Sequence, residues 1–353
     1  MKSLWSNTDA KKFRGDLAQR VYTSRLLGQN PELVLHGGGN TSVKVKQKDF
    51  FGDATEVLYV KGSGWDLETI EKEGFAPVRM DTLMKLAELD SLSDTEMVKQ
   101  QRAAMLDPAA PNPSIEAILH ALIPYKFVDH THANAVVALT NHKGGKKTIE
   151  EVYGDRVLVI PYVMPGFDLA KQVAKQLAKA DPQKIDGLVL MNHGIFTFSD
   201  DAKESYELMI ELVTLAEKHL AKQIGGFKLP KAKPAKDLET LSLIRSEVAA
   251  LRETPVFALL DDSPEAVGFS NREDVAKLAT RGPLTPDHTI RTKRVPVVIG
   301  ADATKSIAKF ASDYKAYFDR YNDGETILTA DPRWAVWPGH GVISFGATEK
   351  EAN

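Results

Sequence analysis

The sequence predicts a mixed α/β protein made of two parts. Short apolar runs bounded by glycine or proline alternate with amphipathic stretches long enough to form helices, which is the pattern of strands and helices packed in layers. A lysine- and proline-rich stretch interrupts this alternation and indicates a boundary. We therefore expect one domain at residues 1–225, a linker at residues 226–240, and a C-terminal α/β extension at residues 241–353.

The composition narrows the class of protein. Of the 353 residues, 43% are hydrophobic and 26% are charged, as in a globular protein with a core. The formal net charge is −3, so no basic surface calls for nucleic acid. The absence of cysteine excludes disulfides and thiolate ligands. Because no apolar run reaches the roughly 18 residues of a membrane span and the N-terminus lacks a signal segment, we expect a cytoplasmic protein without a membrane partner.

The elements of the first part follow from apolar periodicity and from turn residues. Apolar residues three to four positions apart indicate helices, and alternation or short apolar runs indicate strands. The expected helices lie at residues 9–28, 80–106, 114–123 and 201–224. The expected strands lie at residues 43–45, 56–60, 128–134, 156–161, 187–191 and 195–198.

One of these strands carries His130 and His132 inside an apolar run. Strand side chains alternate, so both imidazoles point to the same face and can bind adjacent corners of one metal ion. His193 follows a later strand, beside Gly194, from where its side chain can reach a shared cleft. Three neutral imidazoles with an open fourth position are the ligands of a catalytic Zn²⁺ or a related divalent metal. An ordinary buried strand and turn is the alternative.

Glu116 is the candidate acid or base, because it lies in the first turn of the helix that leads to the histidine strand. Beside a cation it would be a ligand or take a proton next to a polarised carbonyl. The alternative is a charge that stabilises the helix N-terminus. The glycine clusters at residues 37–40 and 62–64 suit an anion, although each alone is typical of a tight turn. Neither is a dinucleotide or Walker motif, so we expect no NAD.

The C-terminal part contains a loose repetition of the first part. Residues 340–351 resemble residues 193–204, and Asp287-His288-Thr289 resembles Asp129-His130-Thr131. We interpret the extension as a degenerate second copy in which Ile290 replaces the second histidine of the pair. A chance likeness is the alternative.

Five short motifs occur in the order found in the class II aldolase/adducin family, which residues 10–225 resemble. The motifs are Gly39-Asn40-Thr41-Ser42, Lys61-Gly62-Ser63-Gly64, Pro113-Ser114-Ile115-Glu116, His130-Thr131-His132 and Asn192-His193-Gly194. Residues 286–293 are similar to the aldolase half of bifunctional rhamnulose-1-phosphate aldolase/alcohol dehydrogenases, in which a short-chain dehydrogenase follows. A helix-capping pattern begins at Thr348, close to the last residue. We expect either that the sequence is one part of a longer polypeptide or that the helix at Thr348 is vestigial.

The resemblance implies a three-layer α/β/α fold, zinc on three histidines, and a glutamate that acts as base and resting-state ligand. The implied metal ligands are His130, His132 and His193, and the implied base is Glu116. The residues implied to hold a substrate phosphate are Gly39, Asn40, Ser63, Gly64 and Ser114. Ile115 stands where smaller sugar-phosphate aldolases carry a second serine. Their proton-donating tyrosine has no clear match, and we do not adopt either candidate, Tyr153 or Tyr162.

We therefore predict a zinc-dependent class II aldolase that cleaves a ketose 1-phosphate similar to rhamnulose 1-phosphate. The products would be dihydroxyacetone phosphate and an aldehyde. A pentulose-phosphate epimerase of the same fold uses nearly the same site and is the closest rival. We also keep open a non-catalytic adducin-like module and the aldolase part of a bifunctional aldolase/oxidoreductase. The resemblance further implies that the chain forms a homo-oligomer, a tetramer. It also implies that the small molecule it binds is a sugar phosphate.

Overall fold

Residues 1–225 and 228–353 are described by a computed structural model, in which they divide into two units. Unit 1 consists of Met1–Gly225 together with Leu284–Asp287, and unit 2 of the other described residues. The first two residues of the expected linker, 226 and 227, lie outside the described part, and α10 (Leu238–Arg252) begins before the linker's expected end. No helix in the described part combines the length and apolar character needed to cross a membrane.

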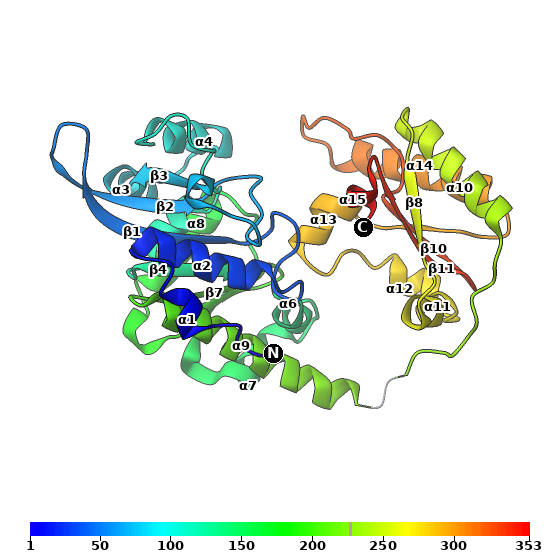
Figure 1. Cartoon of the computed structure of the whole chain (residues 1–353), viewed down its shortest axis with the longest axis horizontal. Helices are drawn as coiled ribbons and strands as arrows, with labels where there is room; N and C mark the ends of the chain where they lie inside the picture. The colour runs from blue at the N-terminus through cyan, green and yellow to red at the C-terminus, as the bar shows by residue number, and fades with distance from the viewer. Residues whose placement is uncertain (226–227) are drawn as a thin grey trace. The chain divides into compact units, whose positions relative to one another are not determined.

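Unit 1 is built on a seven-stranded sheet with the order β3-β2-β1-β4-β7-β6-β5 (Figure 1). The strands are β1 (Asn40–Lys48), β2 (Ala54–Lys61), β3 (Phe75–Arg79), β4 (Phe127–Thr131), β5 (Val157–Ile160), β6 (Gly187–Leu190) and β7 (Gly194–Ser199). Neighbouring strands are antiparallel except for β5 and β6, which are parallel. β4 pairs with β1 on one side and β7 on the other, and all five of its residues are buried.

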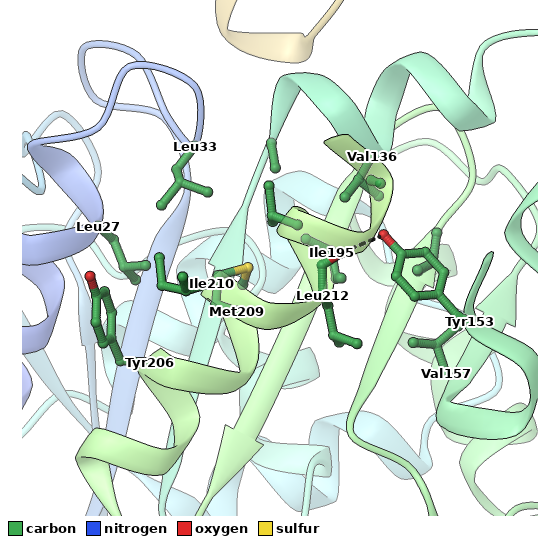
Figure 2. Packing of buried hydrophobic residues seen from close by; sticks show 14 of the residues in the cluster. Leu27, Leu33, Val136, Tyr153, Val157, Ile195, Tyr206, Met209, Ile210 and Leu212 are labelled. Atoms are coloured by element: carbon green, nitrogen blue, oxygen red, sulfur yellow. Dashed lines mark hydrogen bonds between the residues drawn. The ribbon is translucent and has the colours of Figure 1, made fainter. Parts of the chain in front are cut away.

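Helices cover both faces of this sheet, which confirms the three-layer α/β/α fold. One face packs against α2 (Asp16–Gly28), α6 (Asn134–Thr140), α7 (Gly145–Tyr153) and α9 (Ala202–Ile224). The other packs against α3 (Met80–Glu88), α4 (Asp94–Ala103), α5 (Ala117–Leu122) and α8 (Phe167–Leu177). Side chains of β7 alternate between the two faces of the sheet, so this strand contributes to both cores. Ile195 packs with Val136 and Met209 in the first core (Figure 2), whereas Phe196 and Phe198 belong to the second.

Two long helices of the sequence prediction are each split in the structure. The helix expected at residues 9–28 is α1 (Asn7–Ala10) followed by α2, because Gly15 between them has φ 88°, outside the helical region. The helix expected at residues 80–106 is α3 and α4. Ser93 starts α4 by accepting a hydrogen bond from the Glu96 N–H (3.2 Å). By contrast, the helix expected at residues 201–224 is one continuous helix, α9, which begins at Ala202 after its N-cap Asp201.

Unit 2 contains a four-stranded sheet with the order β8-β11-β10-β9. Its strands are β8 (Phe257–Asp261), β9 (Val297–Val298), β10 (Trp334–Trp337) and β11 (Gly341–Gly346). Its helices are α10, α11 (Pro264–Ser270), α12 (Val275–Ala279), α13 (Pro286–Thr292, whose first two residues belong to unit 1), α14 (Ala303–Tyr321) and α15 (Glu349–Ala352). α10 and α14 contribute to one apolar core with the sheet, and α11 and α12 to another.

The sheet of unit 2 repeats half of the sheet of unit 1. In unit 1, β4 is antiparallel to β7, β7 is antiparallel to β6, and β6 is parallel to β5. In unit 2, β8 is antiparallel to β11, β11 is antiparallel to β10, and β10 is parallel to β9. The registers also agree: His130 is opposite Phe196 in unit 1, and Leu260 is opposite Ile343 in unit 2. This pairing and register agree with the interpretation of unit 2 as a degenerate second copy.

The proposed match between the two Asp-His-Thr segments was wrong. Asp129 to Thr131 form part of β4, but Asp287 to Thr289 lie in α13. The strand equivalent to β4 is β8, in which Leu260 stands at the place of His130. The second copy therefore lacks the histidine pair because Leu260 replaces His130, not because Ile290 replaces His132.

Candidate metal centre and active site

His130 and His132 point their Nε2 atoms at each other from the end of the central strand. The Nε2 atoms are 3.1 Å apart, and both rings are buried or nearly so. His130 Nδ1 lies 3.1 Å from the Ile195 carbonyl oxygen, which can only accept, so this nitrogen carries the ring proton. His132 Nδ1 likewise donates to the Asp287 carboxylate (2.5 Å). Two unprotonated Nε2 atoms therefore face one another.

His193 completes the group from the turn between β6 and β7. Its N–H donates to the Leu190 carbonyl (3.2 Å), and its ring centroid lies 5.0 Å from that of His130 and 5.1 Å from that of His132. One nitrogen from each ring falls within 4.8 Å of the others. Gly194 makes this approach possible, because a Cβ there would lie 2.3 Å from the Thr131 carbonyl oxygen and 2.9 Å from the His130 ring.

Glu116 faces the three histidines from the start of α5. The helix begins at Ala117, later than predicted, because Glu116 itself occupies the N-cap position, with φ −90° and ψ 12°. Its Oε2 atom accepts a hydrogen bond from Asn40 Nδ2 (2.7 Å) and lies 3.4 Å from His130 Nε2. Its Oε1 atom is 3.6 Å from His193 Nε2 and is buried without a hydrogen-bond partner among the described residues. The side chain therefore points into the histidine group rather than capping the helix.

Burial keeps the imidazoles in the form that binds metals. Desolvation lowers the pKa of His130 well below its ordinary value, and the neighbouring His132 adds to this shift. Desolvation likewise lowers the pKa of His193 to about 3, although Glu116 opposes the shift. Both rings are neutral at physiological pH, and neutral imidazole is the metal ligand.

The arrangement fits a divalent cation. Unprotonated nitrogens that face one another repel unless a positive charge lies between them, and the partnerless Oε1 atom of Glu116 adds a negative charge beside them. Three imidazoles and one carboxylate suit zinc and related divalent ions, and a three-histidine set leaves a position open for substrate. His130, His132, His193 and Glu116 are thus the residues that would hold the metal.

The predicted anion-binding residues lie in loops beside Glu116. Ser114 N–H donates to the Lys61 carbonyl (3.1 Å) and Ser63 N–H to the Asn112 carbonyl (2.7 Å), so the loops at residues 61–64 and 111–114 run side by side. Ser63 and Gly64 are exposed, whereas Ser114 is buried and accepts a hydrogen bond from the Glu116 N–H (3.2 Å). The Ser63 N–H already donates to the Asn112 carbonyl, so only the Ser63 hydroxyl is left to donate a hydrogen bond to a phosphate.

Gly39 and Asn40 are placed on the metal side of this region. Gly39 has φ 58°, and a Cβ there would lie 2.7 Å from the His130 carbonyl oxygen, which explains the glycine. Both polar atoms of the Asn40 side chain are occupied, Nδ2 by Glu116 and Oδ1 by His120 Nε2. Its side chain therefore positions Glu116, and any contact of Asn40 with phosphate would have to come from its backbone.

Neither of the two tyrosines considered as proton donors lies in this group. Tyr153 is buried in the first core, and its hydroxyl donates to the Leu212 carbonyl (3.0 Å; Figure 2), while desolvation raises its pKa. It cannot reach the histidines. Tyr162 is 54% exposed on the segment after β5.

Three residues of the site were not predicted from the sequence. His120 holds Asn40, and it lies one helical turn after Glu116, a spacing that could have pointed to it. Lys61 is buried, donates to the Gly37 carbonyl (2.8 Å), and has a pKa lowered by burial to about 8. Asp287 attracted notice as part of a repeat and of the family-like segment at residues 286–293, but no local pattern linked it to His132.

Comparison with known proteins identifies the family. The family model for the class II aldolase and adducin N-terminal domain matches residues 18–220. The chain belongs to the class II aldolase/adducin family. A second model, for the second domain of class II aldolase, matches residues 235–353, which include most of unit 2. Members of the family typically depend on a divalent metal, in agreement with the histidine group.

Two relatives of this class II aldolase-family chain are informative. The structure of the N-terminal class II aldolase domain of a conserved protein from Thermoplasma acidophilum is 44% identical, covers 62% of this chain and 99% of its own, and has a TM-score of 0.57. The uncharacterized oxidoreductase YuxG of Bacillus subtilis strain 168 is 35% identical over 370 residues, which cover 98% of this chain and 53% of that relative. The chain thus spans about half the length of this curated relative.

Proposed function

We propose that the chain is a divalent-metal-dependent aldolase that cleaves a ketose 1-phosphate, of the rhamnulose 1-phosphate type, to dihydroxyacetone phosphate and an aldehyde. The observation that carries the proposal is the Glu116 carboxylate, placed 3.4 Å from His130 Nε2 and 3.6 Å from His193 Nε2. A zinc ion held by His130, His132 and His193 would polarise the carbonyl and hydroxyl oxygens of the substrate. Zinc is the ion that this ligand set favours.

The role of Glu116 follows from the balance of the reaction. Cleavage breaks the C3–C4 bond, the C4 hydroxyl gives its proton to water as it becomes the aldehyde, and C3 keeps the electron pair. Glu116 takes up a proton from water, so that no net proton is gained or lost. C3 must then gain a proton to give dihydroxyacetone phosphate. Glu116 in its acid form delivers this proton, and in the reverse direction its carboxylate removes it. Asn40 holds Oε2 through a 2.7 Å hydrogen bond, which leaves Oε1 to face the substrate.

The remaining loops support a phosphorylated substrate. Gly64 has φ 83° and lies in open space beside the exposed Ser63, so its backbone N–H and the serine hydroxyl are available to an anion. Lys61 precedes them and supplies a positive charge below its pKa of about 8. A phosphate on the C1 oxygen would be held there while the carbonyl next to it reaches the histidines.

The test is an assay for dihydroxyacetone phosphate with zinc-loaded protein and several ketose 1-phosphates. We expect Glu116→Gln to lower kcat by about 10²- to 10⁴-fold, as is typical for loss of an acid–base group, while zinc stays bound. Glu88→Gln, a matched change of an exposed carboxylate, should have no effect. Equal rates for Glu116→Gln and wild type would contradict the role of Glu116.

Two rival functions have distinct outcomes in the same assay. A pentulose-phosphate epimerase would interconvert pentulose phosphates without releasing dihydroxyacetone phosphate. An adducin-like module would remain folded without binding zinc and would act on neither substrate class. The complete set of three histidines and Glu116 favours an enzyme over a module. The aldolase part of a bifunctional aldolase/oxidoreductase is compatible with the same chemistry.

A further inference from the structure

One ligand of the metal group is held by a residue that is distant in the sequence. Asp287 Oδ1 lies 2.5 Å from His132 Nδ1, although the two residues are 155 positions apart. Asp287 belongs to Leu284–Asp287, the short segment from the C-terminal part of the chain that is included in unit 1. From this geometry we infer that Asp287 is a positioning residue for the metal centre, supplied by the C-terminal part to the aldolase domain. The inference rests on the metal site of the proposed function.

The position of the Asp287 carboxylate is fixed from three directions. Its Oδ2 atom accepts a hydrogen bond from the Leu35 N–H (2.9 Å), and its side chain is only 2% exposed. Gly38 leaves the space that the carboxylate fills, because a Cβ at that position would lie 2.0–2.2 Å from the atoms of the carboxylate. Gly38 in the glycine cluster is thus explained by Asp287 rather than by an anionic substrate.

The segment is also attached close to the third histidine. The Leu284 carbonyl accepts a hydrogen bond from Asn141 Nδ2 (2.9 Å), and Asn141 Oδ1 accepts one from Asn192 Nδ2 (2.8 Å). Asn192 directly precedes His193 and has φ 59°. The segment Leu284–Asp287 is therefore connected both to the turn that carries His193 and to the ring of His132.

The carboxylate determines which nitrogen of His132 is available to a metal. Because a carboxylate only accepts, Nδ1 must carry the ring proton, and the lone pair remains on Nε2, the atom that faces His130 Nε2. The negative charge also makes the imidazole a stronger donor and fixes its ring plane. Asp287 thus acts through His132, whose Nδ1 atom it holds.

Replacement by asparagine tests this role with little change in size. If the oxygen of the new amide keeps the hydrogen bond to the Leu35 N–H, its NH₂ group faces His132 Nδ1. That nitrogen must then accept, which moves the ring proton to Nε2 and blocks the metal-facing atom. We expect Asp287→Asn to weaken zinc binding about 10- to 100-fold, the usual effect of losing such a partner. Asp262→Asn, at an exposed carboxylate in unit 2, is the matched control and should bind zinc as the wild type does.

The measurement is the zinc dissociation constant of the full 353-residue chain, obtained by competition with a chromophoric chelator. The visible spectrum of the Co²⁺-loaded protein is the second readout, because a changed His132 donor shifts the metal's absorption bands whereas a merely structural contact does not. Gly38→Ala serves as an independent variant, since its methyl group displaces the carboxylate without altering Asp287. It should weaken zinc binding in the same direction.

The outcomes separate this inference from the proposed function. Zinc affinity and Co²⁺ spectra that match wild type in both Asp287→Asn and Gly38→Ala overturn the inference, whether or not the chain cleaves a sugar phosphate. Weakened zinc binding in a chain that cleaves no ketose 1-phosphate supports the inference and contradicts the aldolase proposal. A wild-type chain that binds no zinc overturns the role of Asp287 at a metal site.

Discussion

Asn40 and His130 stand directly opposite each other in the antiparallel pairing of β1 with β4. This register brings the Asn40 side chain between two groups that the sequence separates by a helical turn. Its Nδ2 donates to Glu116 Oε2 (2.7 Å), and its Oδ1 accepts from His120 Nε2. His120 Nδ1 in turn lies 2.7 Å from the Ser42 hydroxyl, which donates to it. A buried chain of hydrogen bonds therefore runs from β1 to the proposed acid–base group.

Replacement of Asn40 by aspartate should disturb Glu116 without removing it. The new carboxylate can still accept from His120 but cannot donate to Glu116, so two carboxylates would face each other at hydrogen-bond distance. One of them must then stay protonated to higher pH. We expect a lower kcat and, in the condensation direction, where the Glu116 carboxylate removes the proton, an ascending limb of the pH–rate profile that moves to higher pH. Ser42→Ala, which changes only the far end of the chain of hydrogen bonds, should leave the profile in place. An unshifted profile for Asn40→Asp would refute the positioning role.

The ion pair of Arg20 with Asp129 should dominate the stability of unit 1. Both side chains are fully buried, and Asp129 Oδ2 also accepts from the Ser205 hydroxyl (2.5 Å). Removal of one partner of a buried pair leaves an uncompensated charge, at a cost of about 3–5 kcal/mol. We expect this loss in the free energy of unfolding of Asp129→Ala, measured by urea denaturation. Ser205→Ala removes only one hydrogen bond and should cost about 1 kcal/mol. If Asp129→Ala lowers the free energy of unfolding by less than Ser205→Ala does, the ion pair contributes little to stability.

The buried histidines should make the metal-free protein sensitive to acid. The pKa of His193 falls from an ordinary value of 6.5 to about 3 in the folded chain, chiefly because of burial, and the pKa values of His120 and His130 are also well below 6.5. At pH values between the unfolded and folded pKa of these histidines, the unfolded chain binds protons on them that the folded chain does not bind. The free energy of unfolding therefore decreases as pH falls from about 6.5 toward about 3.

Urea titrations of the chelator-treated protein at a series of pH values measure this dependence. His193→Asn removes one of the groups responsible and should flatten the slope in that pH range. His219→Asn, at a half-buried position on α9, should not change it. Equal slopes for wild type and His193→Asn would show that His193 takes up its proton equally in both states.

The sequence by itself determined the local features of this protein. The mixed α/β class, the strand that carries His130, the turn at His193 and the helix cap at Thr348 follow from periods and turn residues that act over a few positions, whereas the three-layer arrangement was implied by the family resemblance. The second copy was also visible locally, because residues 340–351 keep the strand-to-helix pattern of residues 193–204.

Only the tertiary structure decided which groups meet around the histidines. The register of β1 against β4 places Asn40 beside Glu116, and the return of Leu284–Asp287 to unit 1 places a carboxylate on His132. It also showed that the equivalent of β4 in the second copy is β8, not the Asp-His-Thr segment. Such contacts depend on packing between elements far apart in the chain, and a short-range pattern carries no record of them.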